Sequence, residues 1–106
     1  MISLSTHVLD TERGLPAAGV LVTLRQDSQE VASGRTDADG RIARLAEGLA
    51  AGTFRLEFDL AEYSAHQGRL MPFLRRLSLE VSLDEDRHYH VPLLLAPYAC
   101  TTYRGS

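Results

Sequence analysis

The chain has 106 residues, an apolar fraction of 44% and a formal net charge of −3 at pH 7. This length predicts one domain over residues 1–106 with a modest core, and the acidic balance argues against nucleic acid and membrane partners. A single cysteine, Cys100, excludes an intrachain disulfide and a thiolate metal cluster. Without a membrane-length apolar run or a signal-like start, we expect a cytoplasmic, soluble protein. The alternative is an exported protein whose signal has been trimmed.

The first half of the chain predicts short strands. Residues 2–9 alternate with a period of two, which sets Leu4 and Val8 on one face and His7 on the more polar face. A turn-rich connection over residues 10–16 leads to predicted strands at residues 19–24, 29–36 and 41–45. Residues 37–40 form a tight turn between the last two, because Asp-Gly favours the left-handed conformation.

The second half adds one helix and more strands. Residues 52–59 alternate, with Phe54 and Phe58 facing inward. Residues 60–67 predict a short helix, for which Asp59 is the N-cap and Glu62 completes a capping pattern. Strands are predicted over residues 74–83, 88–95 and 98–106. Seven to eight strands with frequent turn signals predict an all-β fold, an antiparallel β-sandwich with one short helix.

Three histidines lie on predicted strand faces. A spacing of two puts His88 and His90 on one face, with Tyr89 on the other. Such a pair is half of a possible zinc site, with His7 as the further histidine on a strand. The alternative is that these are ordinary strand histidines, bonded to neighbours or exposed at a strand end.

Arg41 and the chain end carry the other candidate groups. Arg41 follows the tight turn, which fixes its Cα and aims the side chain either at a pocket or into solvent. A frayed end would carry no function, whereas an end held as a last strand would deliver Tyr103, Arg104, Ser106 and the terminal carboxylate to one place. Cys100 is expected to be a small, buried residue rather than a nucleophile.

Several motifs extend along nearly the whole chain, from about Ser3 to Ser106. They are Ser5-Thr6-His7-Val8-Leu9-Asp10-Thr11, Gly14-Leu15-Pro16-Ala17, Thr36-Asp37-Ala38-Asp39-Gly40-Arg41, residues 52–59, residues 88–98 and Thr102-Tyr103-Arg104-Gly105-Ser106. Together they resemble the 5-hydroxyisourate hydrolases, the transthyretin-related enzymes of purine breakdown. The closing Tyr-Arg-Gly-Ser is the most specific motif, because it separates these enzymes from transthyretin, a hormone carrier of the same fold.

The resemblance implies a transthyretin-like fold and hydrolysis of 5-hydroxyisourate to 2-oxo-4-hydroxy-4-carboxy-5-ureidoimidazoline, a cyclic amide hydrolysis without metal or cofactor. It also implies a homotetramer, a dimer of dimers with active sites where the dimers meet. The residues that it assigns to catalysis are His7, Arg41, His90 and Ser106, and those that it assigns to substrate binding are Tyr103, Arg104 and His88.

The chain departs from the family pattern outside these positions. The segment Tyr98-Ala99-Cys100-Thr101 stands where the family usually has Tyr-Gly-Tyr-Ser. Met71-Pro72 replaces an aromatic residue followed by proline, and the chain has no tryptophan. These changes concern local packing and the lining of the channel between dimers.

For the mechanism, we favour His7 as the base that activates water, with His90 orienting the substrate or donating a proton; the reverse assignment stays open. Arg41 and Arg104 would hold the anionic ring and the developing oxyanion, and Ser106 would position water or relay a proton. Three alternatives remain. They are a transthyretin-like carrier of a small hydrophobic ligand, a zinc hydrolase built on His88 and His90, and a purely structural domain.

Overall fold

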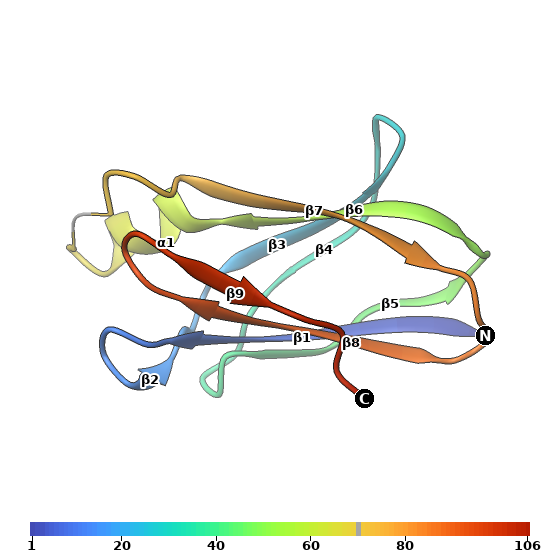
Figure 1. Cartoon of the computed structure of the whole chain (residues 1–106), viewed down its shortest axis with the longest axis horizontal. Coiled ribbons are helices and arrows are strands. Elements are labelled where there is room, and N and C mark those ends of the chain that lie inside the picture. Colours follow the sequence, from blue (N-terminus) through green and yellow to red (C-terminus); the bar gives the residue numbers. More distant parts are fainter. Residues whose placement is uncertain (70) are drawn as a thin grey trace.

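The computed structural model describes residues 1–69 and 71–106. Figure 1 shows two packed layers of strands with a short helix at one end. The first sheet contains β1 (Ile2–Asp10), β2 (Leu15–Pro16), β5 (Arg41–Leu49), β8 (His88–Leu95) and β9 (Cys100–Thr102). The second contains β3 (Leu21–Gln26), β4 (Gln29–Arg35), β6 (Gly52–Asp59) and β7 (Arg76–Leu83), and α1 spans Leu60–His66. The predicted β-sandwich with one short helix is confirmed, and β2 is an extra two-residue strand in the predicted turn region.

One strand pair adds a feature that the antiparallel prediction did not contain. Strands β1 and β8 run parallel, and the other strand pairs among the described residues are antiparallel. A parallel pair requires a long crossover, and the entire second sheet lies between these two strands in the sequence. The turn at residues 37–40 also joins β4 of one sheet to β5 of the other, so it does not close a hairpin.

The core lies between the sheets and is formed by the inward residues of alternating strands. Val8, Leu56, Phe58 and Leu93 are fully buried there. Helix α1 begins as predicted, because the Asp59 carboxylate accepts a hydrogen bond from the Glu62 backbone N–H at 3.0 Å.

The second half of the predicted capping pattern is replaced by another contact. The Glu62 carboxylate pairs with Arg35 of β4, so this charge ties the helix to the neighbouring strand. On the buried side of α1, the Tyr63 hydroxyl donates to the Asp10 carboxylate at 2.8 Å, which links the helix to the end of β1.

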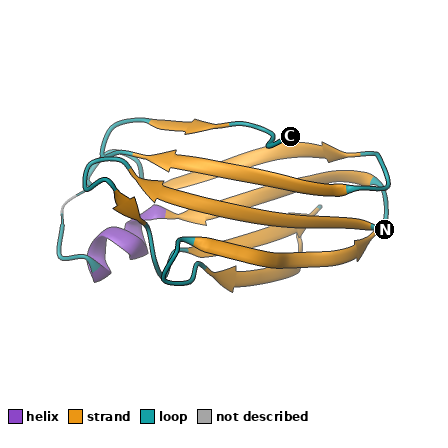
Figure 2. Ribbon diagram, turned by 90° about the horizontal axis from the view of Figure 1, so that it is seen from below, coloured by secondary structure: helices purple, strands orange, loops and turns teal. Residues whose placement is uncertain are grey.

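Figure 2 looks onto the outer face of the first sheet, where β1, β8 and β5 lie side by side. Period-two alternation turns Ser3, Ser5 and His7 of β1 toward this face, because Leu4, Thr6 and Val8 point into the core. Within residues 1–69 and 71–106, no helix is long and apolar enough to cross a membrane. The cytoplasmic location predicted from the sequence stays a prediction.

Candidate functional site

The outer face of the first sheet gathers the three predicted histidines. His7 lies on β1, and His88 and His90 lie on β8, whose register places Ser3 beside His88 and Ser5 beside His90. On β8, Tyr89 and Val91 point into the core, which turns both histidines outward. The predicted assignment of the two histidines to one face and Tyr89 to the other is therefore correct.

Arg41 reaches the same face from the neighbouring strand. It is the direct partner of His7 in the antiparallel register of β1 and β5, and such partners share a face of the sheet. The preceding turn is held by the Asp37 carboxylate, which accepts from the backbone N–H groups of Asp39 at 2.9 Å and Arg41 at 3.0 Å. Gly40 has a φ of +75°, so the Asp-Gly turn fixes the start of β5 as predicted.

A chain of hydrogen bonds joins the two histidines of β8 through serines of β1. Ser5 Oγ lies 2.7 Å from His90 Nδ1 and 2.7 Å from His88 Nε2. Ser3 Oγ lies 2.7 Å from His88 Nδ1 at the exposed end of the chain of bonds. These two serines are partners of the histidines that the sequence interpretation missed. Their pairing follows from the parallel register of β1 and β8, and the periodicity of the sequence does not reveal this register.

The chain end is attached to His90. The Gly105 N–H donates to the His90 carbonyl oxygen at 2.6 Å, and these residues form a β-bridge beyond β9. A Cβ at position 105 would lie 3.0 Å from both His90 Cδ2 and the His90 carbonyl oxygen, so only glycine fits without a shift. Figure 1 shows the C-terminus on the outer side of the first sheet, which brings Ser106 to the side that carries the histidines.

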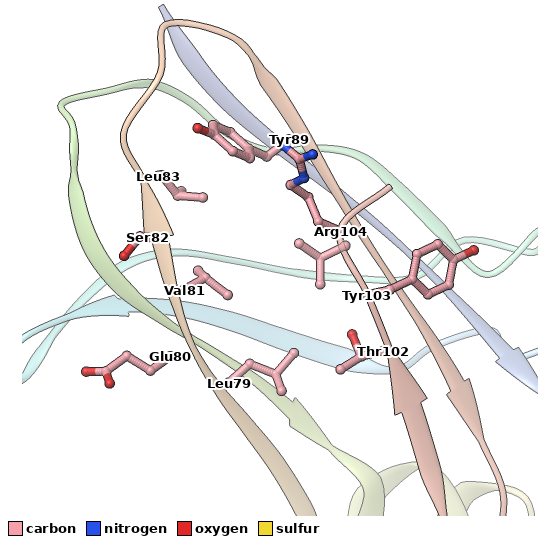
Figure 3. Close-up of a pocket in the computed structure, with 10 residues that line it drawn as sticks. Leu79, Glu80, Val81, Ser82, Leu83, Tyr89, Thr102, Tyr103 and Arg104 are labelled. Carbon is pink, nitrogen blue, oxygen red and sulfur yellow. The ribbon is translucent and has the colours of Figure 1, made fainter. Parts of the chain in front are cut away.

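Tyr103 and Arg104 lie beside a groove that is separate from the histidine face of the same chain. They border a groove of about 360 Å³ at the open edge between β7 and β9, together with Leu83 and Tyr89. Figure 3 shows Arg104 extending toward Tyr89, whereas the ring of Tyr103 points away from the β7 side of the groove. Arg104 therefore extends toward Tyr89 on the inner side of the sheet and not toward the outer face that carries the histidines. The predicted contacts of Tyr103 and Arg104 with substrate stay predictions. The histidine face is a stronger candidate for the site than this groove, because its titratable groups converge.

The electrostatics of the outer face favour a neutral His90. Partial burial lowers the pKa of His90 below its usual 6.5, and the nearby charges of Arg41, His7 and His88 lower it further. A neutral imidazole at pH 7 accepts a proton as a base, and it passes its own proton on only where its other ring nitrogen is protonated at the same time. Across the described residues, no group of three or more His, Cys, Asp or Glu is arranged to hold a metal ion.

The lowered pKa of His90 predicts both how this residue titrates in variants of Arg41 and how the stability of the fold depends on pH. Replacing Arg41 with glutamine should raise the pKa of His90, because a facing positive charge is removed, whereas Arg44→Gln on the same strand should not. In the unmodified protein, the unfolded chain binds a proton below pH 6.5 before folded His90 does. The free energy of unfolding should therefore fall as the pH drops below that value. NMR titration of His90 and urea unfolding at several pH values test both effects; equal His90 titration in the two variants would contradict the assignment.

Three comparisons show which known proteins this chain is similar to. The model of the HIUase/Transthyretin family matches residues 4–105. The 5-hydroxyisourate hydrolase of Caulobacter vibrioides is 45% identical over 100% of both chains. The solved structure of Klebsiella pneumoniae 5-hydroxyisourate hydrolase has a TM-score of 0.92 at 40% identity and covers 100% of both chains. Sea bream transthyretin in complex with thyroxine has a TM-score of 0.89 at 32% identity, covering 97% of this chain and 94% of that chain.

Proposed function

This chain belongs to the HIUase/transthyretin family, and we propose that it hydrolyses 5-hydroxyisourate in urate degradation. The product would be 2-oxo-4-hydroxy-4-carboxy-5-ureidoimidazoline. The two similar solved structures have the same fold but different functions by name: the Klebsiella pneumoniae protein is a hydrolase, and sea bream transthyretin was solved in complex with thyroxine. The fold alone therefore does not decide between them. The observation that carries the proposal is therefore the site: His7, His90 and Arg41 share one face, and the chain end is bonded to His90.

The proposed mechanism assigns one task to each group. His7 accepts a proton from water, which then attacks a ring carbonyl of the substrate. His90, with Nδ1 bonded to Ser5, uses Nε2 to orient the substrate or donate a proton. Arg41 supplies a permanent charge for the anionic ring and the developing oxyanion. Ser106 positions the water or relays a proton beside its terminal carboxylate.

An assay with freshly generated 5-hydroxyisourate tests the function. The protein should accelerate loss of this substrate well beyond its spontaneous decay, and only the excess rate counts. The same rate after chelation and dialysis is expected, because both ring nitrogens of His88 already bond to serines. No excess rate would favour a carrier of a small ligand, and loss of activity on chelation would favour a zinc hydrolase.

We also propose that the enzyme acts as a homotetramer, a dimer of dimers, in which each chain forms one domain over residues 1–106. In a single chain the histidine face is open to solvent: His88 and Arg41 are exposed and His7 is partly exposed. A second pair of chains facing His7, His90 and Arg41 would close the site around the substrate and the attacking water and exclude bulk water, with the Ser3 end of the face left open to solvent. Sedimentation of the unmodified protein tests the assembly, and a stable monomer with full activity would contradict it.

A further inference from the structure

The hydrogen bonds on the outer face form one continuous path from solvent to His90. The path runs from Ser3 through His88 and Ser5 to His90, and each of its three links is 2.7 Å long. Ser3 and His88 stand at its exposed end, whereas Ser5 is only 7% exposed. The parallel register of β1 and β8 holds all four residues in place, because Ser3 pairs with His88 and Ser5 with His90.

Ser5 Oγ donates a hydrogen bond to one of its two histidines and accepts one from the other. A serine hydroxyl has one proton to donate, although its oxygen accepts more than one hydrogen bond. If Ser5 donates to His90 Nδ1, then it accepts from His88 Nε2–H, and neutral His90 carries its proton on Nε2. If Ser5 donates to His88 instead, then His90 carries its proton on Nδ1 and Nε2 has a free lone pair. The tautomers of the two rings are therefore linked through one hydroxyl.

We propose that Ser5 is a positioning residue that couples His88 to His90 and resupplies His90 with protons from the solvent-exposed end of the path. This inference rests on the proposed function, in which His90 Nε2 faces the substrate. When Nε2 gives its proton to the leaving nitrogen, the Ser5 proton moves to His90 Nδ1 and the His88 Nε2 proton moves to Ser5. The Ser3 proton moves to His88 Nδ1, and water replaces it. Both rings begin and end neutral, and the hydroxide left at the Ser3 end is neutralised by the proton that His7 took from the attacking water. The tautomers of both rings are then exchanged. The reverse shift along the same path, with Nε2 taking a proton from water as the product leaves, restores the starting state.

The electrostatics of the face are consistent with this path. Positive charge from Arg41 and from the other histidines opposes a doubly protonated His90. A relay that keeps each ring neutral avoids that repulsion, whereas protonation of the neutral His90 ring by solvent before the transfer would create it. The groups that lower the pKa of His90 are Arg41 on β5, His7 on β1 and His88 on β8. The Gly105 backbone covers its main chain, and the terminal carboxylate of Ser106 follows on the same side of the sheet.

Nitrogen-15 NMR of histidine-labelled protein tests the coupling without reference to activity. The chain has four histidines, so each ring can be assigned by substitution. We expect His90 to hold one dominant tautomer in the unmodified protein and in Ser5→Thr, which keeps the hydroxyl on a strand that suits β-branched residues. In Ser5→Ala, His90 should become a mixture of tautomers. Ser33→Ala, on the exposed surface of β4, is the matched control and should change neither.

Kinetics test the relay. Ser5→Ala should lower kcat roughly tenfold, the size expected for one lost hydrogen bond, with little change in KM, and Ser5→Thr should restore most of it. His88→Gln should act in the same direction, and the double variant should be no worse than either single one. Normal hydrolysis with unaltered tautomers or unaltered kcat in Ser5→Ala would overturn this inference alone. Absence of hydrolysis by the unmodified protein would instead overturn the proposed function.

Discussion

Replacing His7 or His90 with alanine is expected to lower kcat/KM for 5-hydroxyisourate at least about a hundredfold. The reason is that a positioned acid or base contributes roughly two to four orders of magnitude to such reactions. The two side chains lie on adjacent strands of one face, with Arg41 beside them. Because the two residues act in one proton-transfer sequence, kcat/KM of the double variant should be only a little lower than that of the less active single variant.

His66→Ala is the matched control for this experiment. His66 is exposed in the last turn of α1, outside the histidine face, so its removal should leave turnover unchanged. Each variant is compared with the unmodified protein in thermal unfolding and sedimentation, so that a loss of fold or assembly is not mistaken for a loss of chemistry. Near-normal turnover in both the His7 and His90 variants would remove these residues from the mechanism.

The pH dependence of the same variants separates the two roles. The acid limb of kcat/KM reports a group that must be deprotonated. Because His90 passes its proton on from the neutral form, it contributes no alkaline limb. If His7 is the base, His7→Ala should abolish the acid limb, whereas His90→Ala should lower kcat/KM and keep that limb. The reversed pattern would exchange the two assignments but keep both residues in the site.

Local patterns were sufficient to predict the faces of the strands. Alternation placed His7 opposite Leu4 and Val8, and the spacing of two placed His88 with His90, because side chains of a strand alternate between its faces. The Asp-Gly turn predicted a fixed start for Arg41 for the same local reason. The resemblance to a known family, and the roles that it implies for the residues of this face, came from the motifs and not from these periodicities.

Long-range pairing was beyond these patterns. Nothing local in residues 2–9 or 88–95 indicates that β1 and β8 are parallel neighbours, and this register decides which serine meets which histidine. The capping pattern also failed in part, because Glu62 pairs with Arg35, which is distant in sequence. The chain end was predicted as a strand over residues 98–106, but β9 ends at Thr102 and only Gly105 pairs again.

Deleting residues 104–106 is expected to abolish turnover while leaving the sandwich folded. The deletion removes Ser106, its carboxylate and the Gly105 N–H bond to His90. It leaves β9, which still pairs with β8 through Leu93, Leu94 and Leu95. One lost backbone hydrogen bond costs about 0.5–1.5 kcal/mol of stability, a small part of the roughly 5–15 kcal/mol typical of a domain. Activity and the free energy of unfolding should therefore respond very differently.

Smaller changes identify which part of the end matters. Gly105→Ala should lower kcat/KM strongly, because its Cβ would meet His90 at 3.0 Å and push the end away. Gly34→Ala is the matched control, since its Cβ would make only ordinary contacts of 3.7 Å with Ile42. Ser106→Ala tests the hydroxyl, and one added glycine after Ser106 moves the carboxylate. Full turnover by the truncated protein would show that the bonded end serves only to finish the sheet, whereas loss confined to Ser106→Ala would assign the role to its hydroxyl.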